Sequence, residues 1–343
     1  MFAKQAQGAL RAHPLLFHVD GDRWLQPVAV YAAAAVRAVG GGDFSGRIAS
    51  AIAGALDIAL LFAAMQSVTS YRIALGAAIL LLATPAHFWF ARLGTDAIFP
   101  VPFVLGWLTA ALRFVHFDSR KALLTGGLLL GAGVYSHPTA PLLMAWLLAA
   151  LLLATIAGRR SLVSTTAISI GAFALMLAPL ATWFWLHPER YGDTYGRWAV
   201  FAAHLRFPVD GLRAQVNWNT LSNRTNIFWG LLDPSFNFFP LTNTTIAPFL
   251  VLSALTVPLG LVRAATADLT AERIIVIAMA VVPPVVACTF GQPQDLSLVV
   301  TLSAAAAVLT AYGLASVTHR PSWWTWLACA LAAASIYQFA RMW

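Results

Sequence analysis

Long runs of apolar residues, separated by short polar loops, constrain this chain more than any other feature. The runs fall at about 44–66, 73–91, 97–115, 122–136, 138–157, 162–186, 246–263, 273–290, 296–316 and 323–340. Several have the roughly 20 residues that a helix needs to cross a bilayer. Because hydrocarbon offers no water to backbone N–H and C=O groups, such runs must be helical. The sequence therefore predicts an all-α, polytopic transmembrane helical bundle of about ten helices.

The charge content agrees with this fold class. The chain is 60% hydrophobic and 10% charged, whereas soluble domains carry about 25% charged residues. The net charge is +8, but the basic residues stand singly or in pairs between apolar runs. That distribution is typical of topology signals and argues against a nucleic-acid partner.

The short loops predict the orientation of the bundle. Cytoplasmic loops carry an excess of Lys and Arg. One alternating set of loops is basic, and the other set holds Arg92 beside Asp96 and His137. The second set is therefore expected outside the cytoplasm, together with residues 1–43 and 188–245. The basic set comprises Arg72, Arg113, Arg120, Lys121, Arg159, Arg160, Arg263, Arg273 and Arg320.

The chain then divides into four parts. Residues 1–43 form an extracytoplasmic loop whose apolar stretch from Pro27 to Val39 is too short to span. Pro27 suits a first helical turn, and the glycines that follow Val39 would end the helix, which we expect to lie at the membrane interface. Residues 44–187 form a six-helix transmembrane module, 188–245 a large extracytoplasmic loop, and 246–343 four further helices.

Ionisable residues at the outer helix ends are the candidates for chemistry. They can converge on one cavity, where carboxylates act as bases or bind metal, and Arg or His neutralises phosphate. The plainer alternative is that each faces water, or that Arg92 extends to the lipid headgroups. The set comprises Asp20, Asp22, Arg92, Asp96, His137, Asp233 and Asp295.

Three features inside the membrane or the long loop complete the candidates. Asp57 is the only acidic residue within a predicted span; it is either functional or a packing residue bonded to Ser50 or Thr69. Gly127 and Gly131 form a GxxxG pattern that favours close helix approach. The long loop is rich in aromatics such as Trp218, which suit an interface belt or stacking on a sugar ring or polyprenyl tail.

Several chemistries lose support because their motifs are missing from the sequence. There is no Walker-type phosphate loop, no Cys/His metal spacing and no nucleophile elbow. ATP-driven transport and soluble-type hydrolysis are therefore disfavoured.

Four segments together resemble the GT-C class of membrane glycosyltransferases, of the family 39 type that includes protein mannosyltransferases and lipid A aminoarabinose transferases. They are DGDRWLQPVAVYAAAAVRAVGG with FSGRIASAIAGALDIALLF, then RIALGAAILLLATPAHFWFARLGTDAIFPVPFVLGW, GGLLLGAGVYSHPTAPLLMAWLL and FWGLLDPSFNFFPLTN. Their order and spacing carry the likeness over most of residues 1–245. The remainder matches only in hydropathy.

The resemblance implies a reaction. A sugar would pass from a polyprenyl-phosphate donor to an acceptor glycan, lipid or protein on the extracytoplasmic side. A carboxylate would deprotonate the acceptor, and positive charge would stabilise the leaving phosphate. Arg92 and His137 are the candidates for binding that phosphate, while Asp96, Trp218 and Asp233 are expected to contact substrate. No cofactor is demanded, and a divalent metal is left open.

The resemblance also bears on the beginning of the chain. In the family, an early Asp-Glu pair after a first helix supplies the catalytic carboxylate, and MFAKQAQGALR looks like the segment just after it. We therefore expect the first helix and the main catalytic acid to be absent. Asp20 and Asp22 are then supporting acids only.

Three functional alternatives follow. The chain is a bacterial inner-membrane glycosyltransferase, a non-enzymatic transporter or permease, or an inactive truncated product. The bacterial assignment rests on Ala-rich, Arg-over-Lys composition.

The topology can be tested in the long loop. We expect a cysteine introduced at Ser222 to react with a membrane-impermeant thiol reagent from the extracytoplasmic side, because 188–245 is predicted to lie there. Labelling that requires opening of the membrane would contradict the predicted orientation.

Overall fold

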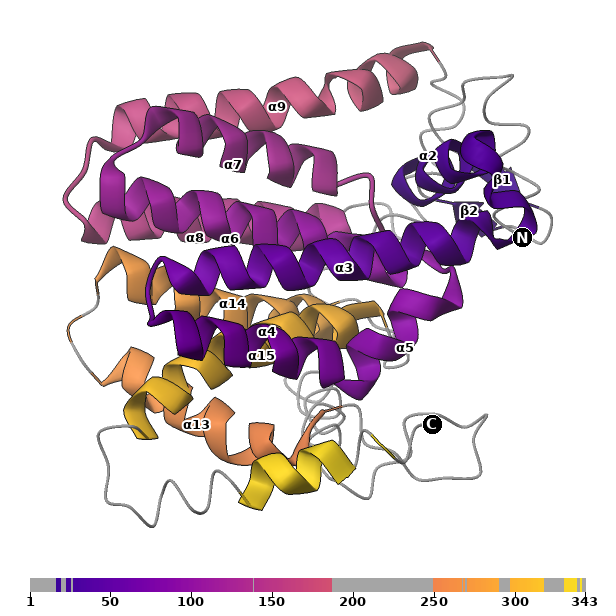
Figure 1. Cartoon of the computed structure of the whole chain (residues 1–343). Helices are drawn as coiled ribbons and strands as arrows, with labels where there is room; N and C mark the ends of the chain where they lie inside the picture. The colour runs from indigo at the N-terminus through magenta and orange to yellow at the C-terminus, as the bar shows by residue number, and fades with distance from the viewer. Residues whose placement is uncertain are drawn as a thin grey trace.

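The computed structural model describes residues 17–19, 23–25, 27–137, 139–186, 249–266, 268, 270–289, 297–317, 330–337 and 340. These residues form a bundle of antiparallel helices with one small β-hairpin beside it (Figure 1). The predicted all-α fold class is confirmed.

The helices coincide with the predicted apolar runs. Residues 330–337, inside the last run, are also helical. The elements of the main bundle are α3 (Ser45–Gln66), α4 (Tyr71–Ala83), α5 (Pro85–Leu93), α6 (Pro100–Phe117), α7 (Arg120–Gly133), α8 (Ala140–Ala157), α9 (Leu162–Leu186), α13 (Val251–Ala265), α14 (Ala271–Thr289) and α15 (Ser297–Val317).

Several of these helices are long and apolar enough to cross a bilayer. Among the described residues there are 4 such helices, or 5 when the bent pair α4–α5 counts as one span. Val251–Ala265 and Val300–Ala315 are apolar but shorter. Fewer helices than the ten predicted therefore meet the length criterion within the described part. The chain is an integral, multi-pass membrane protein.

The predicted second span, 73–91, is not one straight helix. It breaks at Thr84, and α4 and α5 are bent by 59°. Pro85 has no N–H to continue the helical ladder, and Thr84 before it adopts an extended ψ of 120°, as residues preceding proline prefer. The Thr84 hydroxyl donates to Leu80 O over 2.7 Å, which satisfies a carbonyl that the break would otherwise leave unpaired.

The segment before α3 holds one feature that the sequence pattern did not predict. Strands β1 (Phe17–Val19) and β2 (Arg23–Leu25) form an antiparallel hairpin with His18 opposite Trp24. The expected helix follows as α2 (Pro27–Val36), extended by the π-helical turn η1 (Arg37–Gly41) and the 3-10 turn η2 (Gly42–Phe44). Gly40 and Gly42 have φ of 99° and 52°, the left-handed conformation that lets the chain turn into α3.

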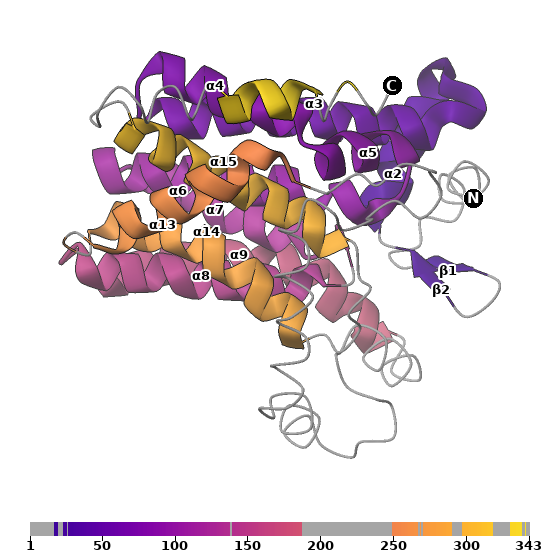
Figure 2. The same cartoon turned by 90° about the horizontal axis from the view of Figure 1, so that it is seen from below.

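The two predicted sets of loops lie at opposite ends of the bundle. The turns α3–α4, α6–α7, α8–α9 and α13–α14 share one end, and α2, the hairpin and α5 lie at the other (Figures 1 and 2). We call the end with α2 and α5 the outer end, following the predicted orientation, and the other end the basic end.

Polar contacts tie the basic end together. Arg160 donates to Phe114 O over 3.1 Å and pairs with Asp118. His116 Nε2 lies 3.4 Å from Glu272 Oε2, and the hydroxyl of Tyr312 bonds to the same carboxylate. The connections after α6 and α8, the first turn of α14 and the last part of α15 are thereby held as one unit.

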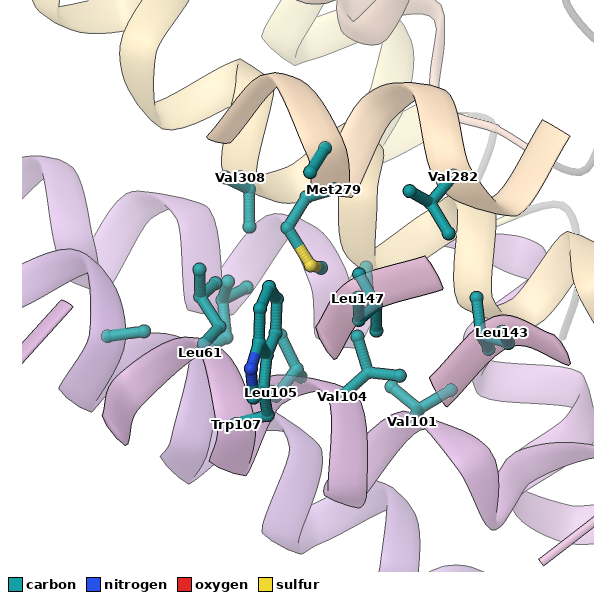
Figure 3. Packing of buried hydrophobic residues seen from close by; sticks show 14 of the residues in the cluster. Leu61, Val101, Val104, Leu105, Trp107, Leu143, Leu147, Met279, Val282 and Val308 are labelled. Carbon is teal, nitrogen blue, oxygen red and sulfur yellow. The ribbon is translucent and has the colours of Figure 1, made fainter. Parts of the chain in front are cut away.

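The core joins helices that are distant in sequence. Leu61 of α3, Trp107 of α6, Leu147 of α8, Met279 of α14 and Val308 of α15 are fully buried and meet in one cluster (Figure 3). Because lipid is as apolar as these side chains, close packing rather than water exclusion must hold them together. The C-terminal helices α14 and α15 therefore belong to the same body as α3–α8.

The GxxxG pattern produces the close approach that was predicted from it. A Cβ on Gly127 would lie 2.6 Å from Ser169 O, and one on Gly131 would lie 2.6 Å from Met176 Cβ and 2.7 Å from Phe173 O. Helix α9 thus packs its backbone into the groove that these two glycines leave on α7.

The first structural prediction concerns this groove. Gly131→Ala should lower the free energy of unfolding by about 1–3 kcal/mol, because the added methyl group meets the α9 backbone. Gly171→Ala on α9 is the control, since a Cβ there meets nothing within 4 Å. Denaturant titration of the purified protein in mixed micelles measures both. Equal effects of the two substitutions would contradict the close-packed interface.

Candidate functional site

Helices α3 and α5 are joined along one face, and this face positions the candidate site. Near the outer end, a Cβ on Gly94 would lie 3.0 Å from Arg47 N, and Gly94 itself has a φ of 69°. One turn further into α3, the Ser50 hydroxyl donates to Thr95 O over 3.4 Å. These contacts bring the chain just after α5 against the beginning of α3.

The same face continues deeper into the bundle. A Cβ on Gly54 would lie 2.7 Å from Ala91 Cβ, so α5 packs directly on the α3 backbone. One turn further, His87 Nε2 lies 3.2 Å from Asp57 Oδ2. Positions 47, 50, 54 and 57 recur every three or four residues, which places them on one side of α3.

Asp57 and His87 form a hydrogen-bonded pair inside the helical bundle. Their exposed fractions are 0% and 1%. Among the residues that the structure describes, Asp57 Oδ1 and His87 Nδ1 have no hydrogen-bond partner. The Oδ2–Nε2 contact is thus the one link that each side chain makes there, and losing it would leave both groups buried and unpaired.

This pairing corrects the partners expected for Asp57. Ser50 bonds to Thr95 O, and the Thr69 hydroxyl donates to Met65 O over 2.7 Å. Sequence reasoning had passed over His87, which stands within an apolar and aromatic run. The signal that could have found it is physical: a lone carboxylate in a span needs a partner at similar depth, and His87 is the ionisable residue of the neighbouring span.

Arg92 lies in the last turn of α5 at the outer end, and its side chain is exposed. Its guanidinium carbon stands 3.8 Å from the centroid of the Phe88 ring, one turn earlier. Stacking on an aromatic face fixes the plane of a guanidinium. Phe88 therefore holds the predicted phosphate-binding residue in a defined direction.

His137 lies in the α7–α8 connection and is buried. The backbone N–H of Thr139 donates to His137 Nδ1 over 3.2 Å, and the Thr139 hydroxyl lies 2.9 Å from the same nitrogen. Because Nδ1 accepts these bonds, the ring hydrogen belongs on Nε2. The N–H donor of the neutral ring is therefore at Nε2.

This connection belongs to the outer end as well. Val28 N of α2 donates to Tyr135 O over 3.2 Å, which joins the connection to the N-terminal helix. The Tyr135 hydroxyl donates to Met176 O of α9 over 2.8 Å. Arg92 and His137 are thus at the same end of the bundle, on two separate connections.

Asp96 begins the short turn η3 (Asp96–Ile98) between α5 and α6. It is partly exposed and stands four residues after Arg92, at the same end. Helix α15 packs against η3 and α5. The structure therefore places Arg92, Asp96 and His137 at one end, as predicted.

The structure does not describe the remaining predicted site residues. Asp20, Asp22, Trp218 and Asp233 lie outside the described residues, and so do Asp295 and the loop 188–245. Their roles, and the division of the chain into four parts, stay predictions. Within the described part, no three His, Cys, Asp or Glu side chains gather as a metal site.

Comparison with known families and structures identifies the fold. Residues 22–185 match the family model described as dolichyl-phosphate-mannose-protein mannosyltransferase. A search of curated proteins gave no significant match. The crystal structure of the apo oligosaccharyltransferase from Archaeoglobus fulgidus superposes with a TM-score of 0.58 at 16% identity, over 98% of this chain and 50% of that one.

Two further solved structures share the arrangement. The archaeal oligosaccharyltransferase AglB from Archaeoglobus fulgidus, in complex with an inhibitory peptide and a dolichol-phosphate, gives a TM-score of 0.55 at 16% identity, over 92% of this chain and 47% of that one. ArnT from Cupriavidus metallidurans bound to undecaprenyl phosphate gives 0.51 at 16% identity, over 92% and 55%.

The chain has the GT-C fold. The GT-C fold that the sequence resemblance implied is thereby confirmed, and the likeness in fold extends beyond residue 245, where the sequence matched only in hydropathy. This GT-C chain spans about half the length of the solved structures that it matches.

The buried pair yields a stability prediction. In this GT-C chain, His87→Leu should lower the free energy of unfolding by about 3–5 kcal/mol, because Asp57 is left buried without a partner. Combining His87→Leu with Asp57→Leu should recover most of that loss, since two apolar side chains need no hydrogen bond. Denaturant titration in mixed micelles measures both variants. A double variant less stable than His87→Leu alone would contradict the assignment.

Proposed function

We propose that this protein is a membrane glycosyltransferase that moves a sugar from a polyprenyl-phosphate donor to an acceptor on the extracytoplasmic side. The acceptor is a glycan, a lipid or a protein. The donor phosphate binds at the outer end of the bundle, where Arg92 is exposed.

One observation carries the proposal. A stacked, exposed Arg92 stands at the outer end of a fold that this chain shares, over 92% of its length, with a protein solved in complex with undecaprenyl phosphate. The family model over residues 22–185 supports the same class of donor through its description.

The chemistry assigns Arg92 a role late in the reaction. When the bond between the sugar and the phosphate breaks, negative charge develops on the departing oxygen. A guanidinium can neutralise that charge and donate two parallel hydrogen bonds to phosphate oxygens. Phe88 fixes the plane of Arg92 in advance, so little ordering remains when the lipid binds.

His137 and the carboxylates have complementary roles in this proposal. The Nε2–H of His137 donates to the donor phosphate or the sugar. A carboxylate accepts the proton from the acceptor nucleophile, and Asp20 and Asp22 are proposed as supporting acids. Asp96, Trp218 and Asp233 contact substrate. A divalent metal stays a prediction, for which Asp96 is one described carboxylate at the outer end.

The proposed location is a bacterial plasma membrane, which the Arg-over-Lys composition supports. A permease remains the second functional class, but no described feature favours it. Among the described residues, Asp57 and His87 are a buried ionisable pair whose members are hydrogen-bonded to each other. Transporters instead direct such groups toward a substrate site in the middle of the membrane.

Binding of undecaprenyl phosphate tests the proposal. Arg92→Ala should weaken binding by about 10- to 100-fold, since a charge-assisted hydrogen bond contributes roughly 1.5–3 kcal/mol. Arg72→Ala is the matched control, because Arg72 is also exposed but lies at the basic end. Tritiated lipid and protein in nanodiscs give the dissociation constants, and transfer of radiolabelled sugar gives turnover.

The outcomes separate cleanly. Weakening confined to Arg92→Ala supports the proposed site. Equal binding by wild type and Arg92→Ala, or equal weakening by Arg72→Ala, would show that the phosphate is not held at the outer end.

A further inference from the structure

Helix α5, which carries Arg92, is poorly fixed by its own chain. It has 9 residues, and helices shorter than about 12 residues are marginal on their own. Thr84 and Pro85 uncouple it from α4, with a bend of 59° between the two helices. The direction of α5 must therefore come from what it packs against.

The face of α5 that meets α3 combines one small apolar contact with one polar contact, and Phe90 of α5 is buried in the apolar core. Ala91 rests on Gly54 of α3, an apolar contact that tolerates sliding and rotation. The contact between His87 Nε2 and Asp57 Oδ2, at 3.2 Å, depends on direction as well as distance. It is buried at both ends, so water does not compete for either partner.

The helical register links this contact to Arg92. His87 and Ala91 are four residues apart and share the face against α3, while Phe88 and Arg92 are also four residues apart. The second pair lies about 100° further round the helix. Fixing His87 on Asp57 therefore fixes the direction in which the stacked Phe88–Arg92 pair points.

We propose that Asp57 and His87 are positioning residues that lock α5 against α3 and thereby aim Arg92 at the donor phosphate. The inference rests on the proposed function and adds a device buried in the membrane that acts through Arg92. Neither residue touches substrate.

The variants separate positioning from stability. Asp57→Leu combined with His87→Leu, called here the Leu/Leu variant, removes the directional bond without leaving an unpaired polar group. Asp57→Asn keeps an oxygen acceptor for His87 and is the conservative rescue. Thr256→Val is the matched control, because it breaks a buried hydroxyl pair with Thr310 of 2.9 Å between α13 and α15.

The first readout is a double-mutant cycle on undecaprenyl phosphate binding. The Leu/Leu variant should weaken binding about tenfold, and adding Arg92→Ala to it should cause no further loss beyond that of Arg92→Ala alone. Asp57→Asn should bind like wild type. Thr256→Val should leave the effect of Arg92→Ala unchanged. Additive losses from Leu/Leu and Arg92→Ala would overturn the proposal.

The second readout does not depend on lipid. Spin labels are attached to cysteines introduced at Leu93 in α5 and at Phe117 at the basic end of α6, both of which are exposed. The native Cys288 and Cys329 are first replaced by serine. The distance between the two labels then reports the position of α5. The distance distribution should be narrow in wild type, Asp57→Asn and Thr256→Val, and broadened or shifted in Leu/Leu. An unchanged distribution in Leu/Leu would overturn the positioning role.

The two readouts distinguish the inference from the function beneath it. If wild type binds no undecaprenyl phosphate, the proposed function fails. The spin-label distances still decide whether the pair sets the position of α5, and an unaltered Leu/Leu distribution would then reject both claims.

Discussion

The hydrocarbon core of a membrane holds no water, so every polar group placed there must find its partner within the protein. This constraint explains the helical fold and also its two local exceptions. Where Pro85 interrupts the second span, the Thr84 hydroxyl takes the carbonyl of Leu80. Where α3 carries Asp57, the imidazole of His87 is hydrogen-bonded to its carboxylate. In both places a side chain supplies the hydrogen-bond partner that water cannot supply.

These exceptions lie together on the path to the candidate site. The break frees α5 from the axis of α4, and the buried pair returns α5 to a defined place on α3. The last turn of α5 then presents Arg92, stacked on Phe88. A strictly regular second span would have carried Arg92 along the axis of α4 instead. The bend and the buried contact together bring a cation to the outer end, beside the connection that holds Asp96.

Much of this arrangement could be predicted from the sequence, because the length of an apolar run and the charge of a loop are signals that many residues share. The apolar runs predicted the helices, and the alternation of Arg-rich loops predicted that Arg92 and His137 lie at the same end. The bend at Thr84 was missed although Pro85 signals it, because the apolar pattern continues through the break. The hairpin of β1 and β2 was missed because short strands carry little periodicity. The partner of Asp57 depends on how two spans are rotated against each other, which hydropathy does not encode. The Gly127–Gly131 groove was predicted correctly because that motif is itself a contact surface.

The central claim is that a lipid phosphate binds at the end of the bundle formed by α5 and the α7–α8 connection. Photo-crosslinking tests it most directly, with an undecaprenyl phosphate analogue that carries a diazirine next to the phosphate and with mass spectrometry of the labelled peptides. We expect label in residues 85–98 and 134–139. Label confined to the basic end, in residues 114–118 or 158–160, would contradict the account.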